Sequence, residues 1–166
     1  MRIRPAITLV ACVLVVGAGA GATTDVTVLR IHNPETGETV GVERVDPGQK
    51  FAIHYIHSFD KTPIHEVYVI RDGKIVQIRE EFQYFAIGLE YTEREQERVG
   101  NFTVLHMERS FDSFSLRVAT YTNQSLVIGD ERTPLTDYAE RWDTLTFSAE
   151  RMSYLEYAYF KATTQV

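Results

Sequence analysis

The sequence contains almost no cysteine. Its single cysteine, Cys12, lies in the first 22 residues, so no disulfide can form within the chain. If those residues are removed, no thiolate remains, which excludes a structural zinc site of the thiolate type. A chain of 166 residues is nevertheless long enough to bury a hydrophobic core without crosslinks.

The chain also has fewer positively charged residues than negatively charged ones. The chain has 17 Lys and Arg against 23 Asp and Glu, a net charge of −6. Nucleic-acid-binding proteins show a basic patch, and this sequence has none. The hydrophobic fraction of 44% argues against a disordered chain. We therefore expect a single folded domain that does not bind nucleic acid.

Several sequence motifs of enzymes are missing. There is no G-x-S-x-G, no glycine-rich phosphate loop and no H-E-x-x-H. Ser58 follows His57 directly, so on a strand the two side chains point to opposite faces, which is the wrong geometry for a nucleophile and its base. We predict a protein that is not an enzyme and that carries no cofactor.

The N-terminus has the layout of a secretory signal peptide. Arg2 and Arg4 precede an apolar run from Pro5 to Val16, and small residues follow up to Ala22. Cleavage after Ala22 removes 22 of the 166 residues, including two arginines, so 144 remain and the net charge moves from −6 to −8. An uncleaved anchor and a lipoprotein signal at Cys12 are the alternatives. All three predict export of one domain, residues 23–166, out of the cytoplasm, to the periplasm or cell surface.

Short strands separated by turns dominate the rest of the chain. Alternating or β-branched runs are expected at residues 24–31, 39–45, 50–58, 102–107, 114–121, 126–128, 144–147 and 154–160. Asn33–Gly37 and Asp46–Gly48 are turn sequences, and the charged residues 92–101 are expected to form a solvated loop. Leu135, Tyr138 and Trp142 are expected core residues in an irregular stretch. No segment shows helical periodicity over three turns. This pattern predicts an all-β protein, an antiparallel sandwich or open barrel of about eight to ten strands.

The clearest local signal is a β-hairpin around Asp72-Gly73. Two alternating runs, residues 66–70 and 75–79, flank this dipeptide, which favours a two-residue turn with positive φ. The resulting register places Glu66 opposite Arg79. It also predicts that Val67, Val69, Val76 and Ile78 face the core and that Glu66 lies on the other face.

The five histidines include an H-x-x-H pair, His54 and His57, which suggests a metal site. A spacing of three places the two side chains on opposite faces of a strand. We therefore predict no metal site from this pair.

A recognition site is predicted where the strand at residues 50–58 turns into the next one. Pro63 constrains the turn, and if the chain folds back, Glu66 can approach His57, raise its pKa and orient its ring. The alternative is a purely structural polar cluster, in which Glu66 pairs with Arg79 and the hydroxyls bind the turn backbone. The predicted ligand- or partner-binding residues are His57, Ser58, Lys61, Thr62 and Glu66, with Arg79 as counter-ion.

The residues Tyr55-Ile56-His57-Ser58, Lys61-Thr62-Pro63 and Glu66 resemble the signature of a prokaryotic family of domains of unknown function, number 1850. Residues 85–90 (Phe-Ala-Ile-Gly-Leu-Glu) and 125–135 extend the resemblance to roughly residues 28–147. Members of that family are small exported proteins, typically encoded beside TRAP transporters of the TAXI type.

The resemblance implies an exported accessory or binding protein that works with a TRAP-type (TAXI) solute importer. Its expected partners are transporter subunits, the solute-binding protein or a small solute, and the membrane only through an uncleaved N-terminal segment. The alternatives are an independent small-ligand or metal-binding β-sandwich protein and, third, an enzyme.

Overall fold

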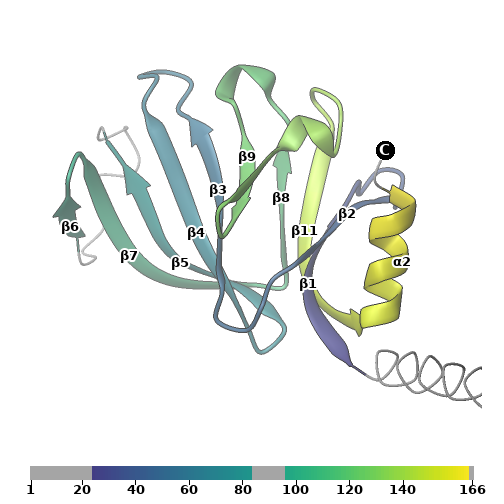
Figure 1. Ribbon diagram of the computed structural model, residues 1–166. Helices are drawn as coiled ribbons and strands as arrows, with labels where there is room; N and C mark the ends of the chain where they lie inside the picture. The colour runs from purple at the N-terminus through teal and green to yellow at the C-terminus, as the bar shows by residue number, and fades with distance from the viewer. Residues whose placement is uncertain (1–23, 84–95, 165–166) are drawn as a thin grey trace, which may run out of the picture.

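The protein folds as two antiparallel β-sheets packed face to face, which confirms the predicted sandwich-like all-β fold (Figure 1). The computed structural model describes residues 24–83 and 96–164. The predicted signal segment, residues 1–22, and residues 85–90 lie outside the described ranges. The smaller sheet has the strand order β2-β1-β11-β8, and the larger has β10-β9-β3-β4-β5-β7-β6.

The described residues form eleven strands, slightly more than predicted. They are β1 (Asp25–His32), β2 (Thr39–Arg44), β3 (Lys50–Ile56), β4 (Pro63–Arg71), β5 (Lys74–Phe82), β6 (Gln96–Val99), β7 (Phe102–Phe111), β8 (Ser113–Arg117), β9 (Ser125–Ile128), β10 (Glu131–Pro134) and β11 (Thr144–Ser153). Two short 3₁₀ helices, η1 (Thr120–Thr122) and η2 (Leu135–Asp137), lie in the connections, and the helix α2 (Tyr154–Thr164) follows β11. The segment at residues 92–101, expected to be a loop, contributes the exposed edge strand β6.

The main core lies between the two sheets. Strands β7 and β8 follow one another with only Asp112 between them, and they carry the chain from the larger sheet to the smaller one (Figure 1). Leu29, Phe51, Leu145 and Phe147 are almost completely buried in this core. Burying such side chains is the main favourable contribution to folding.

The β4–β5 hairpin forms at the predicted turn but with a shifted register. Asp72 and Gly73 both have positive φ, 52° and 74°, as a two-residue hairpin turn of this kind requires. The first four predicted pairs are present, from Arg71–Lys74 to Tyr68–Gln77. A bulge then adds one residue on β5, so Glu66 lies opposite Glu80. The predicted Glu66–Arg79 pair is therefore wrong.

The face of the hairpin that lies toward the main core is not the face that was predicted. Tyr68, Ile70 and Ile75 belong to the main core cluster between the sheets. Val67, Val69 and Val76 are also buried, as predicted, but they alternate with those residues on the outer face of the sheet. The prediction failed because both faces of β4 carry large apolar side chains. Tyr68 stacks on Phe51 and Phe114, with ring centroids 5.3 and 5.0 Å apart. Glu66 lies on this inner face as well.

The predicted last strand, residues 154–160, is instead the helix α2. Ser153 accepts a hydrogen bond from the backbone N–H of Glu156 (3.2 Å) at the start of the helix, an S-x-x-E arrangement typical of helix N-termini. Tyr157 and Phe160 pack against the outer face of the smaller sheet. The aromatic residues suggested a strand, but their packing against β1 and β2 and the serine cap favour a helix.

The three residues expected in the core of the irregular stretch behave differently. Leu135 is fully buried and Tyr138 is half-buried against the core, as predicted. Trp142 is 49% exposed, so this part of the prediction is wrong. In residues 24–83 and 96–164, no helix is both long enough and apolar enough to cross a membrane.

Candidate functional site

The loop between β3 and β4 (residues 57–62) is closed by its own hydrogen bonds. The backbone N–H of His57 donates to the carbonyl oxygen of Thr62 (2.8 Å), and the N–H of Lys61 donates to the carbonyl of His57 (3.1 Å). Asp60 Oδ1 accepts bonds from the backbone N–H (3.0 Å) and the hydroxyl (2.7 Å) of Thr62. Pro63 then begins β4, a position where its missing N–H costs little.

His57 lies beside Asp60 within this loop. The His57 Nδ1 atom is 3.2 Å from Asp60 Oδ1. The hydroxyl of Thr62 and, to a smaller degree, His57 hold the pKa of the Asp60 carboxyl group below its usual value. Asp60 was absent from the predicted site. The D-x-T pattern, in which an aspartate accepts from the backbone two residues ahead, is the local signal that identifies it.

The tip of the β3–β4 loop points its side chains to solvent. Ser58 and Lys61 are exposed, and the ring of Phe59 is 88% exposed. Lys61 has a positive φ of 61°, and its Nζ atom donates to the carbonyl of Ser58 (2.6 Å). The loop therefore exposes the Phe59 ring on a backbone that is held by hydrogen bonds within the loop.

Glu66 is held by two tyrosines rather than by His57. The Tyr68 hydroxyl donates to Glu66 Oε2 (2.7 Å), and the Tyr55 hydroxyl donates to Oε1 (3.1 Å). Burial and the adjacent Glu66 raise the pKa of both tyrosines well above the usual value. Glu66 is paired with Ile53, four residues before His57, which corresponds to about 13 Å along the strand. The structure does not bring Glu66 to His57.

Arg79 lies on the opposite face of the larger sheet and is not the counter-ion of Glu66. Its Nε atom is 2.8 Å from Glu81 Oε1. The other oxygen of Glu81 is 3.1 Å from His65 Nδ1, and the ring of His65 stacks on that of His54 at 3.8 Å. The H-x-x-H pair is thus divided between this outer cluster and the loop. Nowhere in residues 24–83 and 96–164 do three His, Cys, Asp or Glu side chains converge as metal ligands.

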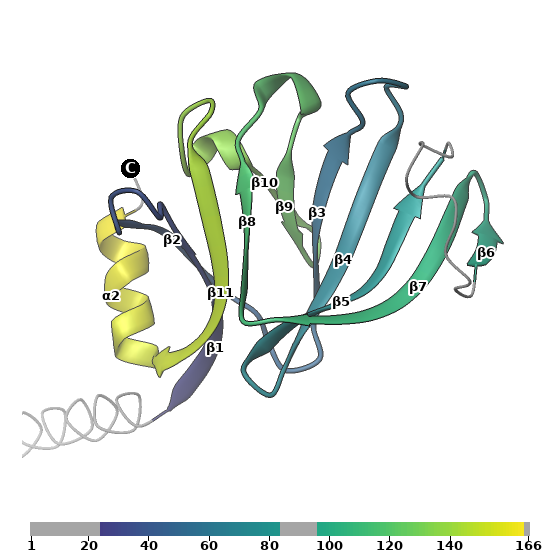
Figure 2. The same cartoon turned by 180° about the vertical axis from the view of Figure 1, so that it is seen from behind.

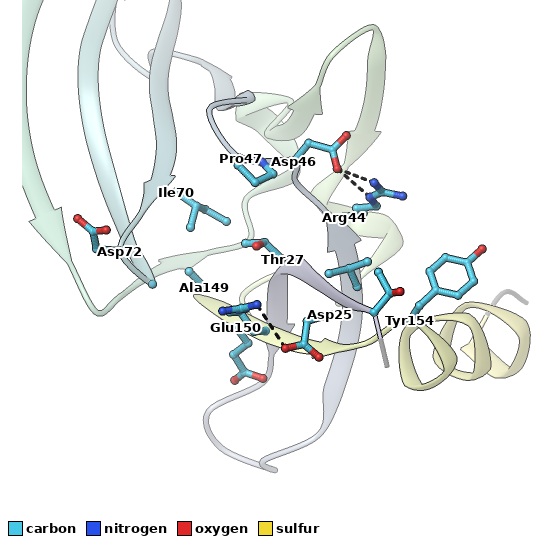
Figure 3. A pocket seen from close by; sticks show the side chains of 14 residues that line it. Asp25, Thr27, Arg44, Asp46, Pro47, Ile70, Asp72, Ala149, Glu150 and Tyr154 are labelled. Carbon is cyan, nitrogen blue, oxygen red and sulfur yellow. Dashed lines mark hydrogen bonds and ion pairs between the residues drawn. The ribbon is translucent and has the colours of Figure 1, made fainter. Parts of the chain in front are cut away.

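A cleft of about 510 Å³ lies where β1 approaches the turn before β3 and the β4–β5 hairpin (Figure 3). Most of its charged side chains neutralise each other. Arg44 pairs with Asp46 (2.8 Å) and Arg151 pairs with Asp25 (3.3 Å). Paired charges leave little net attraction for a charged ligand, so this cleft is a weaker candidate than the β3–β4 loop.

One family model matches the chain. The family is described as a domain of unknown function (DUF1850), and the match covers residues 51–135, just over half of the chain. The chain belongs to this family. The DUF1850 match runs from β3 to Leu135 and includes the β3–β4 loop, Glu66 and both tyrosines that bind it. No curated protein and no solved structure gives a significant match to the chain.

Proposed function

We propose that this DUF1850 protein is an exported, non-enzymatic accessory module that docks on a component of a TRAP-type (TAXI) solute importer. The proposed partner is a transporter subunit or the solute-binding protein, and the β3–β4 loop is the proposed contact. The family resemblance of the Tyr55–Glu66 stretch supports the importer context. The N-terminal sequence, with its positive, apolar and small-residue regions, supports export.

The observation that carries the proposal is the combination of order and exposure in the β3–β4 loop. The His57, Asp60 and Thr62 groups bind each other or the loop backbone, while Phe59 is 88% exposed at the tip. An exposed aromatic ring on a fixed backbone loses little conformational entropy on binding, which favours affinity. Aromatic side chains that become buried when two proteins bind contribute much of the binding energy in many interfaces.

Two other exposed aromatic side chains are carried by connections at the same end of the sandwich. The β3–β4 loop, the β8–β9 connection and the β10–β11 connection all lie at this end (Figures 1 and 2). Tyr121 and Trp142, from the latter two connections, lie 6.1 Å apart between ring centroids. Trp142 has a φ of 79°, a costly conformation for a bulky residue that is found most often at functional positions.

The proposed site is narrower than the one predicted from the sequence. Ser58, Phe59 and Lys61 supply the contact surface, while His57 and Thr62 shape the loop with Asp60. Glu66 supports the inner face of β4 through its two tyrosines and makes no direct contact with the partner. Arg79 does not belong to the proposed site.

The test is co-purification of the importer with the full chain from membranes. Phe59→Ser should abolish co-purification without changing the melting temperature, because an exposed side chain contributes little to stability. Val99→Ser is the matched control, since Val99 is also an exposed apolar residue but lies on β6. Retention of the importer by Phe59→Ser, or its equal loss from both variants, would contradict the proposal. Recovery of the chain only from the cytosol would contradict the export.

A further inference from the structure

A second pocket, of about 430 Å³, lies between the β8–β9 connection and the stretch where β10 runs directly into η2. Its apolar lining includes the exposed Pro134, together with Val118 and Leu135, which are almost completely buried and offer a ligand little surface. Its rim carries the hydroxyl or amide groups of Thr120, Asn123 and Thr136. None of the residues that line this pocket belongs to the β3–β4 loop.

Arg132 is the one charged residue among those that line this pocket within the described ranges. Its Nε atom donates to Ser125 Oγ (2.9 Å), which fixes the plane of the guanidinium group. No acidic side chain in residues 24–83 and 96–164 forms an ion pair with it. The two terminal nitrogens of the guanidinium are therefore available to a ligand, in a protein whose net charge is negative.

The pocket contrasts with the cleft of Figure 3, where two arginines are each paired with an aspartate. Arg132 is exposed and forms no ion pair with the carboxylates of residues 24–83 and 96–164, although Glu131 precedes it in the chain. The Arg132 guanidinium is held by one hydrogen bond, forms no ion pair with the described residues and lies in a pocket with apolar lining residues. These properties suit a ligand with one negatively charged group and a hydrocarbon part.

We propose that this pocket binds a small organic monocarboxylate, with its carboxylate on the terminal nitrogens of Arg132 and its hydrocarbon part against Pro134. Arginine holds a planar carboxylate through two parallel hydrogen bonds. A phosphate is a poorer match, because phosphate sites commonly combine several N–H groups or cations, and one wall of this pocket is apolar.

The proposal is tested by titrating the full chain with acetate, butyrate and benzoate, and with benzamide as the uncharged counterpart of benzoate. Isothermal calorimetry should show saturable binding of at least one acid with one molecule per chain, no binding of benzamide, and weaker binding of inorganic phosphate. Arg132→Gln should weaken binding by about tenfold or more, since it removes a charge-assisted pair of hydrogen bonds. Arg132→Lys, which keeps the charge but not the planar fork, should give an intermediate affinity.

Arg109→Gln is the matched control, because it removes one exposed arginine on β7 and changes the net charge equally. It should bind the acid as the wild type does. Failure of all three acids to bind would overturn the proposal, as would equal binding of benzamide. Equal binding by Arg132→Gln, or preferential binding of phosphate, would overturn it too.

A second readout comes from His54, which lies near Arg132. Burial, His65 and Arg132 together lower the pKa of His54 to about 4. A carboxylate on Arg132 offsets one of these causes, so the pKa of His54 should rise when the acid binds. Nuclear magnetic resonance titration should show this rise in the wild type and not in Arg132→Gln. A rise of the same size in both proteins would contradict binding at Arg132.

Discussion

Replacing Tyr68 with phenylalanine tests the arrangement at the inner face of β4. The hydroxyl of Tyr68 donates to Glu66 Oε2 at 2.7 Å, and the Tyr68 side chain is almost completely buried. Tyr68→Phe keeps the ring stack on Phe51 but leaves that oxygen without its donor. Loss of a buried hydrogen bond to a carboxyl group costs about 1–3 kcal/mol of the free energy of unfolding. For a domain of this length this corresponds to a fall in melting temperature of roughly 3–10 °C.

The matched control is Tyr55→Phe, because Tyr55 donates to the same carboxyl group over a longer distance, 3.1 Å, and is only half-buried. Water can replace this donor, so a smaller loss of about 0.5–1 kcal/mol is expected. Urea denaturation followed by circular dichroism measures both values. In a Glu66→Leu background, Tyr68→Phe should cost less than about 0.5 kcal/mol, because the acceptor is gone. A neutral Tyr68→Phe, or an equal cost in both backgrounds, would refute the reasoning.

Two further predictions concern pH and packing. The pKa of His54 is lowered from 6.5 to about 4, chiefly by burial. Between pH 6.5 and pH 4, His54 therefore binds a proton more readily in the unfolded chain than in the folded one. The free energy of unfolding falls as the pH drops through this range. His54→Phe keeps a ring against His65 and should flatten this dependence in denaturation series at pH 4 to 7, whereas an unchanged slope would contradict the assignment. A methyl group at Gly41 would lie 2.6 Å from the ring of Tyr138, so Gly41→Ala should lower the unfolding free energy by about 1–3 kcal/mol, measured in urea; an unchanged midpoint would show that the ring moves freely.

The features that local chemistry determines were predictable from the sequence. The Asp72-Gly73 turn depends on two residues that are adjacent in the chain. By contrast, β4 begins at Pro63 and not at Glu66, where the strand was predicted to begin. His54 and His57 are apart as predicted, but because β3 ends at Ile56 and His57 lies in the loop, not because the two alternate along one strand. The sandwich-like fold followed from the spacing of such signals, whereas the strand count of eleven in the described residues exceeds the predicted eight to ten.

Features that depend on contacts between distant segments were not predictable in the same way. The bulge on β5 changes the cross-strand partner of Glu66 from Arg79 to Glu80. No residue in the hairpin sequence indicates that this bulge forms. Both faces of β4 carry apolar side chains, so alternation alone could not choose the core face. The aromatic residues of α2 fit a strand as well as a helix until β1 and β2 provide a surface for Tyr157 and Phe160.

Some residues of the candidate site share one loop, but the predicted contacts of Glu66 with His57 and Arg79 are absent. The histidine, lysine and threonine of the signature do share one loop, and Asp60, which joins two of them, was missed. Phe59 carries no chemical group that a motif search would select, and only the structure reveals that its ring is 88% exposed. The Arg132 pocket is assembled from connections that are not adjacent in the sequence, so it too required the structure.

We propose above that the β3–β4 loop contacts a component of a solute importer. Photo-crosslinking in cells from a reactive amino acid placed at position 59 tests it most directly, with the same group at exposed Glu108 on β7 as the reference. We expect one dominant crosslinked product from position 59, containing an importer subunit or the solute-binding protein, and little from position 108. No product from position 59, or the same products from both positions, would contradict the claim.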